Sequence, residues 1–320
     1  MLTLTSIRTG EKAPSAEVDV LIAACGYEGR ARAVAQEFHD AAKKKLAIGF
    51  ATQHELEYRT NSEWFESAGF DFIEVSDSVF REAVDQYLLQ CASGRSEMSI
   101  EIDISCFNRS RLAHLVDALR SLPAKEVKVT FRYSIAEFTP PVEEAAPTVS
   151  VEPVIPQFAG WTTRPDRPPA AIVGLGYEPN KAIGIVDHLE INNATWAYYP
   201  LGPIPEYYLR VLEANQSLLD IIQADGRCQP YELNEPAQLF SEMNSLVDKL
   251  KTHFNAVLIP FGPKLFALIA LLVASLHDDV GVWRVSSGSL ETPVNRKPSG
   301  HIVSVSVVLR AKDESAACPS

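Results

Sequence analysis

Residues 18–30 read Val-Asp-Val-Leu-Ile-Ala-Ala-Cys-Gly-Tyr-Glu-Gly-Arg, and residues 171–181 read Ala-Ile-Val-Gly-Leu-Gly-Tyr-Glu-Pro-Asn-Lys. Each stretch is a short apolar run that stops at Gly-Tyr-Glu and passes into a helical pattern. A continuous apolar run of this length is typical of a strand that is buried on both faces. Two such stretches in one chain indicate a duplicated unit.

Strand and helix patterns alternate through both halves of the chain. The first half predicts a helix over Arg30–Lys45, a strand that ends at Asp103 and a strand over Val127–Tyr133. The second half repeats this order, with a strand that ends at Pro260 and a last alternating strand over Ile302–Leu309. Such alternation predicts parallel sheets with helices on both faces. The predicted fold class is therefore α/β, built from duplicated Rossmann-like units with mainly parallel sheets.

A proline-rich segment separates the two halves. Eight prolines lie between residues 139 and 169, a density that neither a helix interior nor a central strand tolerates. An edge strand is possible in this segment at Thr148–Ile155. The expected parts of the chain are an N-terminal leader or short edge strand (1–16), a first Rossmann-like unit (17–138), a Pro-rich connector (139–169), a second Rossmann-like unit (170–310) and a loose C-terminal tail (311–320).

Composition narrows the functional classes. The 320-residue chain has a formal net charge of −12, which argues against a general duplex nucleic-acid binder because such proteins need surplus cations for phosphates. Five scattered cysteines without a Cys-x-x-Cys pair fit neither a zinc site nor a disulfide scaffold, and suit a reducing compartment. The apolar run Leu265–Leu276 is shorter than the roughly 20 residues that span a bilayer. We expect a cytoplasmic protein without a secretion signal, membrane span, metal or cofactor.

Four turns lie where open parallel sheets bind ligands, outside the carboxyl ends of strands. They are Cys25–Arg30, Ser105–Ser110, Gly174–Lys181 and Phe261–Lys264. Residues that bind a ligand or catalyse a reaction are therefore expected in these turns.

The two Gly-Tyr-Glu turns leave two interpretations open. The residues concerned are Gly26, Tyr27, Glu28, Gly176, Tyr177 and Glu178. In the structural interpretation the glutamates sit in the first helical turn, where the helix dipole favours them, and the tyrosines only pack. In the functional interpretation the tyrosines stack on a base, and the glutamates accept hydrogen bonds from ribose hydroxyls or an exocyclic amine. A dinucleotide fingerprint fits poorly, because Pro179 stands where its last glycine would be.

The other pair of turns brings a cation into the start of a helix. Arg109 and Lys264 are unfavourable for the helix dipole at these positions, but they suit an anion held by the same helix N-terminus. Gly262 precedes the lysine, while Ser105 and Asn108 either contact the ligand or simply cap the helix. Neither turn has the spacing of a Walker A loop.

Catalytic residues are harder to identify. Asp103, which ends a buried strand, and Glu28 are the only acid candidates, and both are weak. Cys106 lacks the flanking glycines of a nucleophile elbow, so a small buried cysteine is the simpler interpretation. The loop Asn295-Arg296-Lys297 is either a solvated hairpin tip or a basic flap over the cleft.

The stretch Leu258-Ile-Pro-Phe-Gly-Pro-Lys-Leu-Phe-Ala-Leu resembles the second ligand-binding turn of CARF domains, which are Rossmann-like sensors of cyclic oligonucleotides in bacterial anti-phage systems. The Gly-Tyr-Glu turn stands where their first ligand turn follows the first strand. Two fused copies resemble the SAVED arrangement, a tandem around one ligand. The resemblance implies a sensor that acts through a protein partner carrying the effector activity.

The sequence thus predicts binding of a nucleotide-like anionic ligand in a cleft between two Rossmann-like units, as a sensor in a bacterial defence system. Two alternatives remain. One is an enzyme acting on a nucleotide or phosphate ester at one cleft, and the other is a non-catalytic scaffold in a multi-protein complex.

Overall fold

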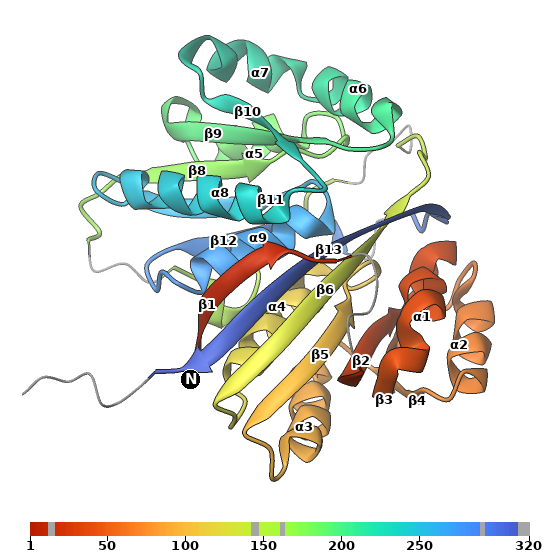
Figure 1. Cartoon of the computed structure of the whole chain (residues 1–320). Coiled ribbons are helices and arrows are strands. Elements are labelled where there is room, and N and C mark those ends of the chain that lie inside the picture. Colours follow the sequence, from red (N-terminus) through yellow and green to blue (C-terminus); the bar gives the residue numbers. More distant parts are fainter. Residues whose placement is uncertain (12–16, 142–146, 161–163, 289–291, 313–320) are drawn as a thin grey trace, which may run out of the picture.

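The computed structural model describes residues 1–11, 17–141, 147–160, 164–288 and 292–312, which form two β-sheets with helices packed on them (Figure 1). Residues 12–16 of the expected leader, residues 142–146 and 161–163 of the connector, and residues 313–320 of the expected tail lie outside the described residues. Within the described ranges, no helix is both long and apolar enough to cross a membrane.

Among the residues that the structure describes, the first sheet has seven strands. Their order is β1 (Leu2–Thr9), β13 (Pro298–Ala311), β6 (Glu126–Ala136), β5 (Glu97–Asp103), β2 (Val18–Cys25), β3 (Ala42–Phe50) and β4 (Asp71–Val75). Neighbours from β6 to β4 are parallel, whereas β13 is antiparallel to both β6 and β1. The N-terminal segment therefore contains the short edge strand that was one of our two expectations.

The second sheet has six strands within the described ranges. Their order is β10 (Cys228–Glu232), β9 (Thr195–Leu201), β8 (Pro169–Gly174), β11 (Asn255–Pro260), β12 (Gly281–Ser286) and β7 (Ser150–Pro153). The strands from β10 to β12 are parallel, and β7 pairs antiparallel with β12. The edge strand expected in the connector is thus present.

Five consecutive strands follow the same order in both sheets. The series β4-β3-β2-β5-β6 in the first sheet matches β10-β9-β8-β11-β12 in the second. Numbered along each half, both series read 3-2-1-4-5, the strand order of a Rossmann fold. The α/β fold with mainly parallel sheets and helices on both faces is confirmed, and the shared order supports the duplication.

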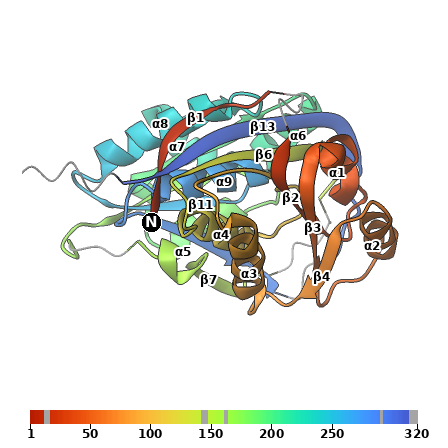
Figure 2. The ribbon, with the colours of Figure 1, turned by 60° about the horizontal axis from the view of Figure 1, so that its bottom comes forward.

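The sixth strand of each sheet comes from the other half of the chain. The strand after β6 along the chain is β7, which pairs with β12. The strand after β12 is β13, which lies beside β6 and pairs with it (Figure 2). Our prediction that the last strand belongs to the second unit is therefore wrong. An alternating pattern shows which face of a strand is buried, but not which open sheet edge the strand pairs with.

The helices form three layers around the two sheets. Their bounds are α1 (Ala33–Phe38), α2 (Tyr58–Ser67), α3 (Phe80–Ala92), α4 (Arg109–Arg120), α5 (Lys181–His188), α6 (Pro205–Ala214), α7 (Gln216–Ile222), α8 (Pro236–Leu250) and α9 (Lys264–Ala274). Short 3-10 turns cover Gly29–Arg32, His39–Ala41, Pro156–Phe158, Asn192–Ala194 and Gln223–Asp225. Helices α3, α4, α8 and α9 share one apolar core with both sheets, while α1 and α2 pack on the first sheet and α5 to α7 pack with the second.

Two predicted helices had different outcomes. The apolar run after Lys264 is a buried helix as expected, because every residue of α9 from Leu265 to Ala274 is buried between the sheets. The helix predicted over Arg30–Lys45 is too long, since α1 ends at Phe38 and β3 begins at Ala42. Sheet pairing with β2 is available from Ala42 onward and takes these residues into the strand.

Candidate ligand-binding site

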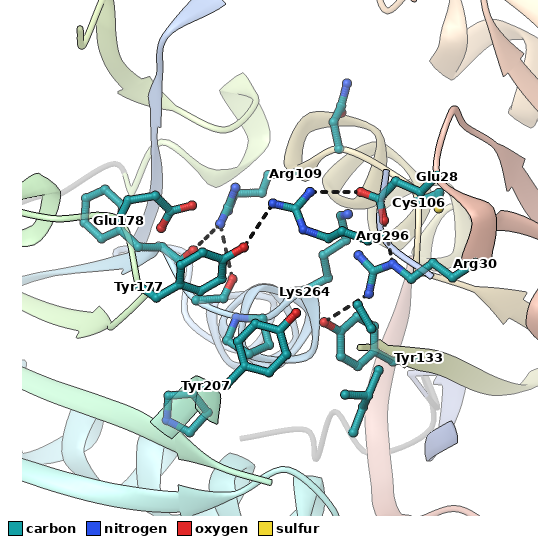
Figure 3. Close-up of a pocket in the computed structure, with 18 of the residues that line it drawn as sticks. Glu28, Arg30, Cys106, Arg109, Tyr133, Tyr177, Glu178, Tyr207, Lys264 and Arg296 are labelled. Atoms are coloured by element: carbon teal, nitrogen blue, oxygen red, sulfur yellow. Dashed lines mark hydrogen bonds and ion pairs between the residues drawn. The ribbon is translucent and has the colours of Figure 1, made fainter. Parts of the chain in front are cut away.

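The four predicted turns line one cavity. They follow β2 and β5 in the first sheet and β8 and β11 in the second, the strand pairs that flank the point where strand order reverses. The cavity has a volume of about 380 Å³, within the range of roughly 300–1,000 Å³ usual for small-molecule sites. Ten of the eleven predicted binding residues line it: Gly26, Tyr27, Glu28, Asn108, Arg109, Gly176, Tyr177, Glu178, Gly262 and Lys264. The turns of both halves therefore face a shared space (Figure 3).

Buried asparagines hold the two Gly-Tyr-Glu turns in place. The Asn61 amide donates to the backbone oxygens of Gly26 and Glu28, at 2.8 and 2.9 Å. In the other half, the Asn215 amide donates to the backbone oxygen of Gly176 at 2.7 Å. Both asparagines are almost fully buried, so each turn is fixed by a polar group shielded from water. This shared device is a further sign of duplication.

The two glutamates of these turns have different surroundings. Glu28 is buried, caps no helix with its side chain, and lies 2.6 Å from Arg30 Nε and 3.3 Å from Arg296 Nη1. Glu178 lines the opposite part of the cavity (Figure 3) and makes no ion pair with any other residue that the structure describes. The structural interpretation, in which this glutamate only caps the helix that follows it, is therefore wrong for Glu28.

The tyrosines also differ. Tyr177 accepts a hydrogen bond from Arg296 Nη2 at 3.2 Å, and its ring lies 5.5 Å from the ring of Tyr207. Tyr27 packs partly buried against the core formed by β2, β3 and α2. Packing and cavity lining thus occur together, so the two interpretations do not exclude each other.

Arg109 and Lys264 reach across to the other half in a reciprocal manner. Arg109 Nη2 donates to the backbone oxygens of Phe261 and Gly262, at 2.6 and 3.3 Å. Lys264 Nζ donates to the backbone oxygen of Ser105 at 2.8 Å. Each cation begins a helix of one unit and holds the turn of the other, which closes the floor of the cavity.

Two predicted residues have structural roles. Asn108 caps α4, because its side-chain oxygen accepts from Arg111 N at 2.8 Å. Ser105 is fully buried, and its hydroxyl accepts from Ser134 N at 2.8 Å rather than facing the cavity. Since the Ser105 side chain is absent from the lining, its prediction as a direct binding residue is not supported by its position.

The pKa values of several charged residues in the cavity are shifted. Burial lowers the pKa of the Lys264 amine to about 8, although nearby Glu28 opposes this shift. Burial alone would raise the pKa of Glu28, but Arg30, Lys264 and Arg296 outweigh it and hold that pKa below its ordinary value. Burial alone would lower the pKa of Arg296, yet Tyr177 and Glu28 raise it. Glu28 and Arg296 are therefore ionised at neutral pH, whereas Lys264 titrates near physiological pH.

Two residues considered for catalysis, Asp103 and Cys106, fit a catalytic role poorly. Asp103 lies behind the lining, 1% exposed, and accepts from Ser105 N at 2.8 Å, while burial raises its pKa to about 6. A general acid or base must come within hydrogen-bond reach of the substrate. Cys106 does line the cavity, but burial raises the pKa of its thiol far above the ordinary value, which disfavours the nucleophilic thiolate. The described residues contain no group of three or more His, Cys, Asp or Glu that could hold a metal ion.

Several other residues that line the cavity were not among the predicted binding residues. They are Arg30, Tyr133, Lys181, Tyr207, Tyr208, Arg284 and Arg296. Of these, Arg296 belongs to the loop for which a basic flap was one of two interpretations. Its side chain lies in the cavity with 26% of its surface exposed, so the solvated hairpin tip is wrong. The available signal was a basic cluster just before the last strand.

Comparisons with known proteins give no family. No protein-family model and no curated protein matches the chain. Among solved structures, a chain from Galdieria sulphuraria that is provisionally assigned as a sarcosine dimethylglycine methyltransferase aligns over 92% of this chain and 78% of its own length, with 10% identity and a TM-score of 0.22. A similarity at this level carries no functional argument, so function must be argued from the site.

Proposed function

We propose that the cavity between the two units binds a nucleotide-like anionic ligand. The observation that carries this proposal is the sign of the charge. Among the described residues that line the cavity, six are cationic and two are acidic, in a chain whose net charge is −12: Arg30, Arg109, Lys181, Lys264, Arg284 and Arg296 against Glu28 and Glu178. Cations gathered in a cleft of low dielectric attract anions far more strongly than the same cations on an open surface.

Two further features favour a ligand with both phosphate and an aromatic ring. The helices α4 and α9 point their N-termini at the cavity floor, where backbone N–H groups and the helix dipole stabilise phosphate. Aromatic rings line the walls, among them Tyr177, Tyr207 and Tyr208. Stacking on such rings stabilises a base, typically by about 1–3 kcal/mol.

A thermal-shift panel tests the proposal. Mono-, di- and cyclic oligonucleotides are compared with adenosine, which has a base but no phosphate. A ligand at 100 times its dissociation constant adds about 2.7 kcal/mol to the free energy of unfolding. Lys264→Met keeps the length of the side chain and removes its charge, so it should abolish most of the shift. Lys128→Met, on an exposed strand position, is the matched control. Absence of a shift with every nucleotide would refute the proposal.

The wider role belongs to the same proposal but rests on the resemblance of the turns alone. In it, the protein is the ligand-sensing component of a bacterial defence system, and a partner protein carries the effector. In cells with the intact system, Lys264→Met should then remove phage protection while Lys128→Met preserves it. Equal protection by both variants would leave ligand binding standing and reject the defence role.

A further inference from the structure

Arg296 is held over the cavity by a docked segment of backbone. Gly29 N donates to the Asn295 side chain at 2.8 Å, and Arg30 N donates to the backbone oxygen of Arg296 at 3.1 Å. On the other side, Glu137 N donates to the backbone oxygen of Lys297 at 2.9 Å. These bonds fix the main chain on the first half of the protein, so only the side chain of Arg296 is left to move.

That side chain connects the two Gly-Tyr-Glu turns. Its Nη1 lies 3.3 Å from Glu28 Oε1 in the first turn, and its Nη2 donates to the Tyr177 hydroxyl in the second turn at 3.2 Å (Figure 3). Both distances are long for charge-assisted hydrogen bonds, which usually measure about 2.7–2.9 Å. Arg296 therefore bridges the cavity through two weak contacts, in the space where a ligand would lie.

Glu28 does not depend on Arg296 for its charge balance. Arg30 Nε lies much closer, at 2.6 Å from Glu28 Oε2, and both residues of this pair are buried. Removing the only partner of a buried charge is costly, but Glu28 would keep Arg30 if Arg296 left. Arg296 is thus the guanidinium that can be released at little cost.

We propose that Glu28 and Arg296 form a latch that the anionic group of a ligand opens by taking Arg296 away from Glu28. The phosphate offers the guanidinium two parallel, charge-assisted hydrogen bonds in place of two long ones. Glu28 then acts as an internal competitor of the ligand and as a positioning residue for Arg296, not as an acceptor for a ribose hydroxyl. This inference rests on the proposed function and assigns the residue that first binds the anion.

A double-mutant cycle measured by titration calorimetry tests the latch, with inorganic pyrophosphate and ATP as probes. The variants are Glu28→Gln, Arg296→Met and both together, and Glu178→Gln is the matched control because it removes the same charge from the equivalent turn. We expect Glu28→Gln to bind pyrophosphate about fivefold more tightly than the wild type, within the range of couplings between contacting residues. That gain should vanish in the Arg296→Met background. Glu178→Gln also removes a negative charge, so it can raise the affinity through net charge alone. Any such gain in affinity should persist in the Arg296→Met background.

The outcomes separate the two proposals. If neither probe binds the wild-type protein, both the anion-binding function and the latch are rejected. If the probes bind but Glu28→Gln binds no more tightly than Glu178→Gln, or keeps its gain without Arg296, only the latch is rejected. Should Glu28→Gln fail to fold, Glu28→Asp replaces it, because the shorter side chain withdraws from Arg296 and keeps the charge that pairs with Arg30.

Discussion

Identical residues at equivalent positions have diverged in this molecule. The backbone of each Gly-Tyr-Glu turn is fixed by a buried asparagine, yet Glu28 is paired with Arg30 and Arg296, whereas Glu178 has no such pair among described residues. The sequence could predict that these turns face a ligand site, because turns at the carboxyl ends of parallel strands share one edge. It could not predict Arg296 as a partner of Glu28, since Arg296 approaches from the far end of the chain.

At the residue scale, the pH dependence of binding follows from Lys264. Burial lowers the pKa of its amine to about 8, so the positive charge disappears as the pH rises through that value. The affinity for ATP should fall between pH 7 and 9, and titration calorimetry across this range measures it. Lys264→Met should bind more weakly at pH 7 and lose this pH dependence. An affinity that falls equally in both proteins would show that another group is responsible.

The same group affects stability with the opposite sign. The folded pKa of Lys264 lies below its ordinary value of 10.5, so the unfolded chain holds the proton over the pH range between them. Stability rises with pH wherever the unfolded state binds more protons. Burying the charged Lys264 therefore lowers the free energy of unfolding most strongly below pH 8. This unfavourable contribution shrinks as the pH rises from 8 to 10.5.

At the element scale, a helix or strand is predicted correctly where its hydrophobic pattern fits only one kind of secondary structure. The apolar run of α9 is buried on every side, and the strands that end at Asp103 and Pro260 end there as predicted. The predictions fail where a stretch fits both a helix and a strand. Lys43 follows α1 in a polar stretch that fits a helix end, but it lies in β3 and pairs with Asp19 of β2 at 3.2 Å. Tertiary pairing overrides local propensity at that point.

A proline substitution should destabilise the protein far more in the central strand β13 than in the edge strand β1 beside it. Val307 pairs with Val129 of β6 and with Ile7 of β1, so Val307→Pro removes a backbone donor from the interior of the sheet. We expect the free energy of unfolding to fall by about 1–3 kcal/mol for the backbone acceptor left unpaired, or the chain to fail to fold. Thr5→Pro is the control, because Thr5 lies at the register shift between Leu4 and Ser6 at the sheet edge, where proline is tolerated. Urea unfolding followed by circular dichroism compares the two, and an equal effect would contradict the central position of β13.

At the scale of the whole molecule, the exchanged strands and the shared core bind the halves together. Neither β7 nor β13 pairs within the half that precedes it, and α9 packs between the sheets against α4 and α8. The sequence indicated two units and their order, but not this exchange, because each open sheet edge accepts an antiparallel strand from either half. The cavity then lies between parts that cannot separate without breaking the core. A ligand bound in the cavity should therefore stabilise both halves together against unfolding.

This cooperativity leads to a prediction for the core of α9. Leu268 is fully buried between the sheets, so Leu268→Ala should lower the free energy of unfolding by about 2–5 kcal/mol. Because the core is continuous, amides in β2 and in β8 should lose protection at the same, lower urea concentration in hydrogen-exchange mass spectrometry. Leu209→Ala on α6, where the side chain is 62% exposed, should change stability by less than about 0.5 kcal/mol. If Leu268→Ala released β8 while β2 stayed protected, the halves would unfold independently, and a ligand between them would have no single structure to stabilise.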